Sequence, residues 1–436
     1  MKYFGTDGIR GEYNKFLTPN LVKLATLGLA YNLNEGDKVI VGRDPRISSD
    51  AIFDVVSQAL TTSGIKVIDL GVIPTPVVSL MIKELSANAG IMISASHNPF
   101  SDNGIKFFDQ SGVKISDELE ASIEEYIDNP VDFSRKPEVV EYVDPTNSYL
   151  EMVKRILHKA EGIKVALDCA NGASYQLAKA VFGQLGAQVH VIGDKPDGYN
   201  INDNVGALHP NNLSKFVVEN ECDCGFCYDG DADRIIAIDN EGNILTGDHI
   251  MYLLAKHLKE KDSLNKDTLV ATVMSNIGLI SSLKELGIKT VCTSVGDRYV
   301  IQEMQEHDYN LGGEQSGHLI LSDYVTTGDG ILTSVVLLSI IKDNHKILNE
   351  TFKNLPIYPQ KLVNVEVSDK NAIMQDSKLQ AKIAKTNEEL DTSGRVLIRP
   401  SGTEELVRIM VEARDENLMC QIVDDFYNII LKLSTQ

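Results

Sequence analysis

Short hydrophobic runs alternate along most of this chain with longer stretches of helical pattern. Such alternation is typical of parallel or mixed sheets whose strands are joined by crossover helices, so it predicts α/β domains. The expected strands are residues 38–42, 65–70, 89–93, 163–168, 188–192, 224–228, 269–273 and 289–293. The expected helices are residues 48–64, with Ser48 and Ser49 as caps, and residues 74–85, 174–185 and 277–286. The rhythm occurs three times, which predicts three tandem, related α/β domains.

The C-terminal part of the chain has a different pattern. Residues 361–367 alternate between apolar and polar side chains like a half-exposed strand, and residues 395–398 and 406–413 are also expected to be strands. One helix is expected over residues 371–390 and a second over residues 418–433. These elements predict a smaller α+β domain. With linkers expected at residues 128–144 and 354–360, the predicted domains are residues 1–144, 145–244, 245–357 and 358–436.

Length and charge limit the classes of function. A chain of 436 residues is too long for a single core, which agrees with several domains. It has 62 acidic and 41 basic residues, a net charge of −21, and this argues against a general nucleic-acid binder. An anionic ligand would need local arginines, backbone N–H groups or a metal ion to offset that charge.

No feature of the sequence indicates a membrane or an oxidising compartment. No apolar signal region follows Met1, and the longest apolar stretch, residues 331–341, is too short to span a bilayer. Six thinly spread cysteines fit a reducing compartment, so we expect a cytoplasmic protein. Cys222, Cys224 and Cys227 raise the question of zinc, but no second Cys/His cluster lies nearby, and small residues of a buried strand explain them.

The first candidate for chemistry is the loop Ser94-Ala95-Ser96-His97-Asn98-Pro99, which follows the apolar run at residues 90–93. In open α/β sheets, ligands bind at the carboxyl ends of the strands. Ser96 is therefore a candidate covalent carrier of phosphate.

A second loop, Asp229-Gly230-Asp231-Ala232-Asp233-Arg234, follows the strand expected at residues 224–228. Carboxylates at alternate positions of an extended segment point to one side, and all-oxygen ligands suit a hard cation such as Mg²⁺. A calcium EF-hand loop is excluded because its required glycine and glutamate are replaced by Arg234 and Asn240. The alternative is a solvated acidic turn, although three like charges this close repel one another.

Two further loops carry groups that bind phosphate or sugar. Arg399-Pro400-Ser401-Gly402-Thr403-Glu404, with Arg408, offers planar paired donors, hydroxyls and a glycine that admits an anion, although it could be an ordinary turn. Gly312-Gly313-Glu314-Gln315-Ser316-Gly317-His318 places a carboxylate, an amide, a hydroxyl and an imidazole between glycines, which suits a sugar or a flexible turn.

Single residues near these loops could act as acids or bases. Lys106, in Asp102-Asn103-Gly104-Ile105-Lys106, could be a general base if burial or a cationic neighbour lowers its pKa, or it could be a surface lysine. His318 could be structural or catalytic. The glycine-rich segment Gly5-Thr6-Asp7-Gly8-Ile9-Arg10-Gly11 brings a further arginine. Together these groups suit the transfer of a phosphoryl group from serine to a sugar hydroxyl.

These motifs, from residues 5–11 to residues 399–404, resemble in kind and order those of the α-D-phosphohexomutase family. The resemblance extends over essentially the whole chain. It implies three related α/β domains and a smaller C-terminal domain around a central cleft. It also implies an isomerase, a Mg²⁺-dependent intramolecular phosphotransferase that works through a phosphoserine and a sugar 1,6-bisphosphate intermediate.

The resemblance assigns roles to individual residues. It implies that Ser96 is the phosphoserine and that Ser96, Asp229, Asp231 and Asp233 hold one Mg²⁺ per active site. It implies that Lys106 and His318 transfer protons and that Arg10 lies near the transferring phosphate. The residues that it implies for the sugar hydroxyls are Glu314 and Ser316, and those for the other phosphate are Arg399, Ser401, Gly402, Thr403 and Arg408.

Within the family, residues 4–8, residues 98–108 and Gln315 are similar to the branch that acts on glucosamine phosphates. This implies interconversion of glucosamine 6-phosphate and glucosamine 1-phosphate, which feeds UDP-N-acetylglucosamine and cell-wall synthesis. Glu405 departs from the common pattern, in which proline often follows the threonine-glutamate pair. The alternatives are a preference for mannose or glucose phosphates, a non-catalytic sugar-phosphate-binding regulator and a metal-dependent phosphatase. A hexosamine phosphate is the expected partner, without nucleic acid or membrane, and a homodimer is left open.

Overall fold

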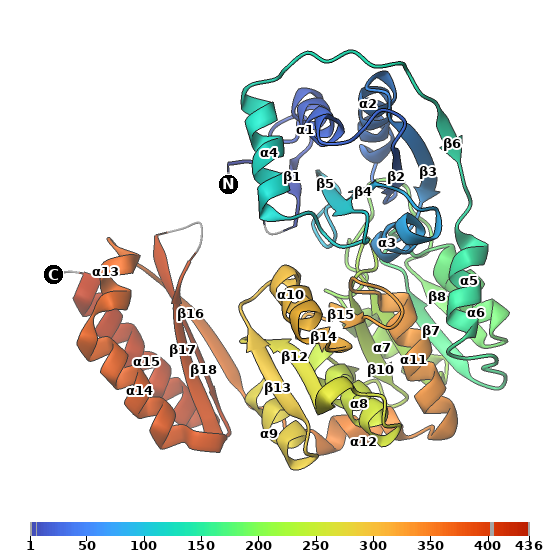
Figure 1. Cartoon of the computed structure of the whole chain (residues 1–436). Helices are drawn as coiled ribbons and strands as arrows, with labels where there is room; N and C mark the ends of the chain where they lie inside the picture. Colours follow the sequence, from blue (N-terminus) through green and yellow to red (C-terminus); the bar gives the residue numbers. More distant parts are fainter. Residues whose placement is uncertain (1, 6, 402–404, 435–436) are drawn as a thin grey trace. The chain divides into compact units, whose positions relative to one another are not determined.

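The computed structural model describes residues 2–5, 7–401 and 405–434. Its contacts divide the chain into two compact units, residues 1–274 with 289–353, and residues 275–288 with 354–436. The first unit contains three α/β sheets, and the second contains a small antiparallel sheet with its own helices (Figure 1). The predicted class, three α/β domains and a smaller α+β domain, is confirmed.

The first sheet has six strands in the order β1-β5-β4-β2-β3-β6. Its central strand β4 is buried at every position, which explains why its sequence is a continuous apolar run. The sheet is mixed, because β5 pairs antiparallel with both β4 and β1 while β2, β3, β4 and β6 are parallel. Its strands are β1 (Ile9–Glu12), β2 (Lys38–Arg43), β3 (Lys66–Val72), β4 (Ala89–Ile93), β5 (Asp102–Asp109) and β6 (Val140–Tyr142). The helices of this part are α1 (Pro19–Tyr31), α2 (Ser49–Thr62), α3 (Thr75–Glu84) and α4 (Asp117–Asp128).

The second and third sheets are also mixed, with strand orders β11-β10-β9-β7-β8 and β13-β12-β14-β15. In each, a parallel core of three strands ends in an antiparallel hairpin. The second part contains α5 (Thr146–Lys154), β7 (Lys164–Asp168), α6 (Leu177–Gln184), β8 (Gln188–Ile192), α7 (Asn211–Glu219), β9 (Cys224–Tyr228), β10 (Ile235–Asp239) and β11 (Ile244–Leu245). The third contains α8 (Gly247–Glu260), η1 (Asn265–Asp267), β12 (Thr268–Thr272), β13 (Lys289–Thr293), α10 (Asp297–His307), β14 (Leu311–Gly313), β15 (Leu319–Leu321), α11 (Gly330–Asp343) and α12 (Ile347–Asn354).

The second compact unit is an antiparallel sheet of order β16-β18-β17 with four helices. The single helix expected over residues 371–390 is wrong. Asp376 interrupts it, and the carboxylate of Asp376 accepts the backbone N–H of Leu379 to begin a new helix. The elements are α9 (Ile277–Glu285), β16 (Gln360–Glu366), α13 (Lys370–Gln375), α14 (Ser377–Leu390), η2 (Asp391–Ser393), β17 (Gly394–Pro400), β18 (Leu406–Ala413) and α15 (Glu416–Ser434).

Two other local expectations change. Ser48 stands at the N-cap of α2, but its side chain makes no capping bond and instead accepts a hydrogen bond from Asn103 Nδ2 at 2.9 Å. Residues 331–341 lie in α11, which packs inside the first unit with almost every side chain buried. Across the described ranges, every helix is too short or too polar to cross a bilayer.

Candidate active site

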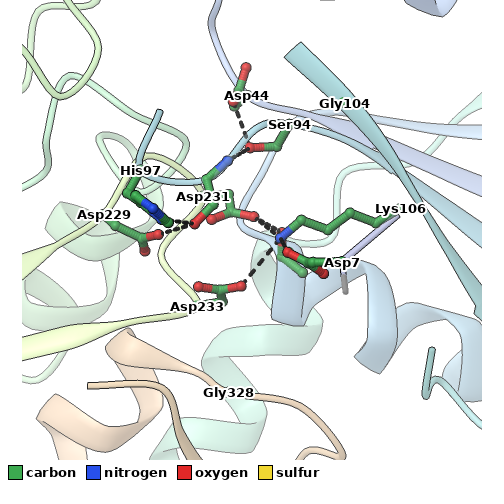
Figure 2. Close-up of polar contacts among 12 residues, drawn as sticks. Asp7, Asp44, Ser94, His97, Gly104, Lys106, Asp229, Asp231, Asp233 and Gly328 are labelled. Carbon is green, nitrogen blue, oxygen red and sulfur yellow. Dashed lines mark hydrogen bonds and ion pairs between the residues drawn. The ribbon is translucent and has the colours of Figure 1, made fainter. Parts of the chain in front are cut away.

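Ser96 lies in the turn that follows β4, with the rare left-handed backbone angle φ +52° for a residue other than glycine. Its side chain is buried, and Ser96 Oγ donates a hydrogen bond to Asp229 Oδ2 at 2.5 Å. The backbone N–H of Ser96 donates to Ser94 Oγ, and Ser94 Oγ donates to Asp44 Oδ2 (Figure 2). The structure therefore joins the serine loop to the aspartate loop across 133 positions of sequence.

The three carboxylates lie in the turn between the antiparallel strands β9 and β10. This turn is tighter than the extended segment expected, because Ala232 has φ +57°. One oxygen from each of Asp229, Asp231 and Asp233 falls within 4.8 Å of the others, and all three side chains are buried. Thr75, at the first position of α3, holds the turn by donating Oγ1 to Asp231 Oδ2 at 2.5 Å and its backbone N–H to the Asp231 carbonyl.

The donor set fits a hard divalent cation. Asp231 Oδ1 and Asp233 Oδ1 are buried and accept no hydrogen bond within the described part of the chain. Burial and the two neighbouring carboxylates raise the pKa of Asp229, which shows that the cluster needs positive charge. Carboxylate oxygens are the ligands that Mg²⁺ takes in proteins. These three residues can therefore hold the metal ion.

Lys106 supplies the positive charge in this structure. It extends from β5 and places Nζ 2.6 Å from Asp231 Oδ2, 3.2 Å from Asp233 Oδ2 and 3.2 Å from Asp7 Oδ2 (Figure 2). Burial opposes its charge, but Asp231 and Asp233 outweigh burial and raise the pKa of Lys106. These contacts favour the protonated form of Lys106, whereas a role as a base requires its pKa to fall.

His318 closes the other side of the carboxylate cluster. Its Nδ1 lies 3.7 Å from Asp233 Oδ1, and its Nε2 accepts the backbone N–H of Gly328 at 3.1 Å. That bond favours the neutral tautomer with the proton on Nδ1, facing Asp233. Burial lowers the pKa of His318, but Asp233 and Asp297 outweigh it and raise that pKa above the ordinary value.

The loop that carries Glu314 is the hairpin turn between β14 and β15, and it packs directly on the aspartate loop. The Gly317 carbonyl accepts the backbone N–H of Ile235 at 3.0 Å. Gly317 has φ +92°, and a Cβ there would lie 2.1 Å from the Ile235 carbonyl oxygen, so only glycine fits. Glu314 Oε1 accepts the Gly296 N–H at 3.1 Å, and Ser316 is exposed at the tip of the turn.

Gln315 lies in the same turn. The resemblance associates this residue with the branch that acts on glucosamine phosphates, but its side chain forms a hydrogen bond within the protein. Its Nε2 donates to Asp248 Oδ2 at 3.0 Å, and its carbonyl accepts the Gly247 N–H. The side chain thus ties the turn to the start of α8.

The structure connects Arg10 to two residues that the sequence did not single out, Lys114 and Asp297. Arg10 forms a close ion pair with Asp7, and Asp7 also contacts Lys114. Lys114 Nζ lies 2.5 Å from Asp297 Oδ2, and burial lowers the pKa of Lys114. Asp297 in turn lies 3.6 Å from His318 Nε2. This chain of alternating charges had no sequence signal, because Lys114 and Asp297 are 183 positions apart.

The residues expected to bind the second phosphate lie in the second unit. Arg399 on β17 and Arg408 on β18 are directly opposed in the antiparallel register, so both side chains emerge on one face of the sheet. Like charges placed opposite each other repel, and an anion would relieve that repulsion. Ser401 is buried and its N–H donates to the Leu406 carbonyl, while Gly402 and Thr403 lie outside the described residues.

Two remaining questions from the sequence are answered by local contacts. Glu405 forms an ion pair with Lys370 at 3.4 Å, so its charge is partly compensated. Cys222, Cys224 and Cys227 are buried as free thiols in and beside β9. Among the described residues, the aspartate triplet is the group of metal-ligating side chains that comes together.

Comparison with known proteins agrees with this site. Models of the phosphoglucomutase/phosphomannomutase family match in order: alpha/beta/alpha domain I over residues 1–132, domain II over residues 141–242, domain III over residues 246–358 and the C-terminal domain over residues 362–429. The phosphoglucosamine mutase of Bacillus subtilis is 47% identical over 440 residues, which cover 98% of each chain. That of Geobacillus thermodenitrificans is 48% identical with the same coverage.

Solved structures show the same fold. A phosphoglucomutase/phosphomannomutase family protein from Burkholderia thailandensis superposes with a TM-score of 0.83, covering 99% of this chain and 97% of that one at 23% identity. The chain belongs to the phosphoglucomutase/phosphomannomutase family, and as such it is an isomerase.

Proposed function

We propose that this chain interconverts glucosamine 6-phosphate and glucosamine 1-phosphate through a phosphoserine at Ser96. The observation that carries the proposal is the contact of Ser96 Oγ with Asp229, inside a buried carboxylate cluster that can hold a metal ion. The relatives that match 98% of the chain at 47–48% identity are phosphoglucosamine mutases, and this favours glucosamine over other sugars. The product would supply UDP-N-acetylglucosamine and cell-wall synthesis.

In the proposed reaction, the phosphoryl group leaves Ser96 Oγ for the free sugar hydroxyl, and that hydroxyl gives up its proton. The products are a sugar 1,6-bisphosphate and unmodified Ser96. The bisphosphate then returns its other phosphoryl group to Ser96, which leaves the isomeric monophosphate. The enzyme ends each cycle in its starting form, so a sugar 1,6-bisphosphate serves as intermediate and activator.

Two groups are proposed to exchange the proton. Lys106 lies at the carboxylate cluster, and it can act as a base only when Asp231 and Asp233 are engaged by another cation, because these carboxylates raise its pKa. His318 contacts the other carboxylate oxygen of Asp233 and is the second candidate for proton transfer. Arg10 is proposed to neutralise charge on the transferring phosphoryl group.

Residues of the loops described above are proposed to bind the metal ion, the sugar and the other phosphate. Asp229, Asp231, Asp233 and an oxygen on phosphorylated Ser96 would hold one Mg²⁺, which when bound neutralises charge on the transferring phosphoryl group. Glu314 and Ser316 are proposed to bind the sugar hydroxyls. The proposed ligands of the other phosphate are Arg399, Ser401, Gly402, Thr403 and Arg408.

The test of substrate is a comparison of kcat/KM for glucosamine, glucose and mannose 6-phosphates with Mg²⁺ and a catalytic amount of glucose 1,6-bisphosphate, since specificity is that ratio. We expect the glucosamine phosphate to be preferred at least about tenfold, as one well-placed polar contact can provide. A preference for glucose or mannose phosphate would overturn the substrate assignment. Stoichiometric release of inorganic phosphate would instead indicate a phosphatase, and binding without conversion would indicate a regulator.

The proposal also includes the domain limits, the cellular location and the oligomeric state. The domain limits are residues 1–144, 145–244, 245–357 and 358–436, the location is cytoplasmic, and two copies form a homodimer. Sedimentation of the purified chain tests the last, and limited proteolysis tests the limits.

A further inference from the structure

The loop that carries Ser96 points four backbone carbonyl oxygens at a single guanidinium. Arg46 Nη2 donates to the carbonyls of Ser96 and Asn98, both at 2.9 Å. Arg46 Nη1 donates to the carbonyls of Pro99 and Asp102. With the remaining Nε–H on Asp44, all five donors of the guanidinium have partners, and the Arg46 side chain is fully buried.

Asp44 connects this guanidinium to the other end of the serine loop. Asp44 Oδ2 accepts both Arg46 Nε at 2.8 Å and Ser94 Oγ at 2.7 Å. Ser94 Oγ in turn accepts the backbone N–H of Ser96 at 2.9 Å. The N–H and the carbonyl of Ser96 are therefore held, directly or through one hydroxyl, by the same buried ion pair.

A second side chain reaches the same carbonyls from the part of the chain that carries the aspartate loop. Asn202 Nδ2 lies 2.9 Å from the Ser96 carbonyl oxygen and 3.1 Å from that of Asn98. Gly230 of the aspartate loop leaves the space that this approach needs, because a Cβ there would lie 2.4 Å from the Ser96 carbonyl oxygen. Arg46 and Asn202, which lie in different segments of the chain, thus donate to the same two carbonyl oxygens.

The left-handed backbone of Ser96 needs such a restraint. A residue other than glycine is strained in this region, and the conformation persists when surrounding contacts determine it. We propose that Arg46 and Asn202 are positioning residues of the transfer step, which clamp the Ser96 and Asn98 carbonyls and so direct Ser96 Oγ at Asp229. The inference rests on the proposed function, because it assigns the clamp to phosphoryl transfer.

The test compares R46K and N202A with R135K as the matched control. Arg135 also donates to backbone carbonyls, those of Ala30, Leu33 and Ser63, but these lie at the ends of α1 and α2. Lysine keeps the charge at either position but loses the planar fork of donors. We expect kcat to fall about 100-fold in R46K and about tenfold in N202A, with KM within about twofold of the wild type, because small misplacement of a reacting group has effects of this size.

Two further measurements separate positioning from a general loss of stability. The rate at which glucose 1,6-bisphosphate phosphorylates dephosphorylated Ser96, followed by intact mass, should fall by the same factors as kcat. Amide hydrogen exchange should rise in residues 94–104 for R46K and N202A, and only near residues 30–33 and 61–64 for R135K. R135K should keep kcat within about twofold of the wild type even if its melting temperature falls.

The outcomes decide the proposal. Unchanged kcat in N202A, or equal losses of kcat in R46K and R135K, overturns it, and so does unchanged exchange in residues 94–104. If R46K does not fold, N202A alone carries the test. If the wild type converts none of the three sugar phosphates, the proposed function fails, while the exchange measurement still decides whether the clamp exists.

Discussion

Residues 94–99 and residues 229–234 are turns that each follow an apolar strand, and each contains a buried left-handed residue, Ser96 at φ +52° and Ala232 at φ +57°. In the serine loop, backbone carbonyls accept from a buried guanidinium. In the aspartate loop, side-chain carboxylates face a buried ammonium, that of Lys106. Both turns contact a buried cation, but Arg46 binds neutral carbonyls as well as the carboxylate of Asp44, whereas Lys106 binds carboxylates.

The two loops therefore differ in how their charges are balanced: the serine loop needs no ligand for this, and the aspartate loop can bind one. The carbonyls around Arg46 are neutral, so one cation and Asp44 satisfy each other and leave no charge to compensate. In the aspartate loop, Lys106 contacts Asp231 and Asp233, and one buried oxygen of each of these two carboxylates accepts no hydrogen bond in the described chain. The serine loop is therefore held by groups of the protein alone, whereas the aspartate loop can also hold a cation.

The largest expected effect comes from removing the nucleophile. We expect S96A to lower kcat for glucosamine 6-phosphate by at least about 10⁴-fold, because no other group can carry the phosphoryl group. The measurement is turnover together with intact mass, which should show phosphate on the wild type and none on S96A. S79A is the control, since Ser79 is also buried but bonds the Gly112 carbonyl. Full activity in S96A would show that Ser96 does not carry the phosphoryl group, and the comparison of the serine loop with the aspartate loop would lose its basis.

The next effect tests whether the aspartate loop needs a cation. D231N should lower kcat about 10²–10³-fold, because the site loses a charge that it uses in the transition state. Mg²⁺ at about 100 times its Kd should stabilise the wild type by about 2.7 kcal/mol, and D231N by much less, as measured by thermal unfolding. D239N is the control, because Asp239 is buried but bonds local backbone N–H groups. An equal response to Mg²⁺ in D231N would contradict a metal role for this loop.

A smaller effect concerns the support of the aspartate loop. Asp168 accepts the N–H groups of Ala170 and Gly206, and burial raises the pKa of Asp168 to about 6. The folded pKa lies above the unfolded value of about 3.8, so the contribution of Asp168 to stability is present below pH 3.8 and is lost as the pH rises through about 6. Between pH 4 and pH 7, the free energy of unfolding of the wild type should fall relative to D168N by roughly 2 kcal/mol. Urea unfolding at both pH values measures this, and a difference that does not depend on pH would show that folding leaves the pKa of Asp168 unchanged.

The smallest expected effect tests whether the hydrogen bond from Thr75 orients Asp231 in addition to the ion pair with Lys106. T75V removes the Oγ1 donor to Asp231 but leaves the Lys106 contact in place. We expect kcat to fall about tenfold, since a hydrogen bond to a charged group contributes about 1.5–3 kcal/mol. T26V is the matched control, because the Thr26 hydroxyl bonds only within α1 in the described structure. Equal kcat in T75V and T26V would mean that Lys106 alone orients Asp231.

The buried parallel strands of the fold could be predicted because burial leaves a local pattern. The strand β4 is apolar at all positions since both of its faces are covered, and the sequence reports this directly. Residues 102–106 are not among the strands that the sequence predicts, yet they form the start of β5. Its polar residues Asn103 and Lys106 are buried by partners far along the chain, so its pattern did not resemble a strand.

The sequence by itself determined which residue types could do chemistry, because a serine, a carboxylate triplet and paired arginines have their donor and acceptor properties wherever they lie. Only the tertiary structure decided how they are used. It placed Lys106 as the counter-ion of the carboxylates, joined Lys114 to Asp297, and turned the serine-loop carbonyls toward Arg46. Hydrophobic periodicity depends on neighbours within a few residues, whereas ion pairs and hydrogen bonds depend on distances in space, which the folded chain alone sets.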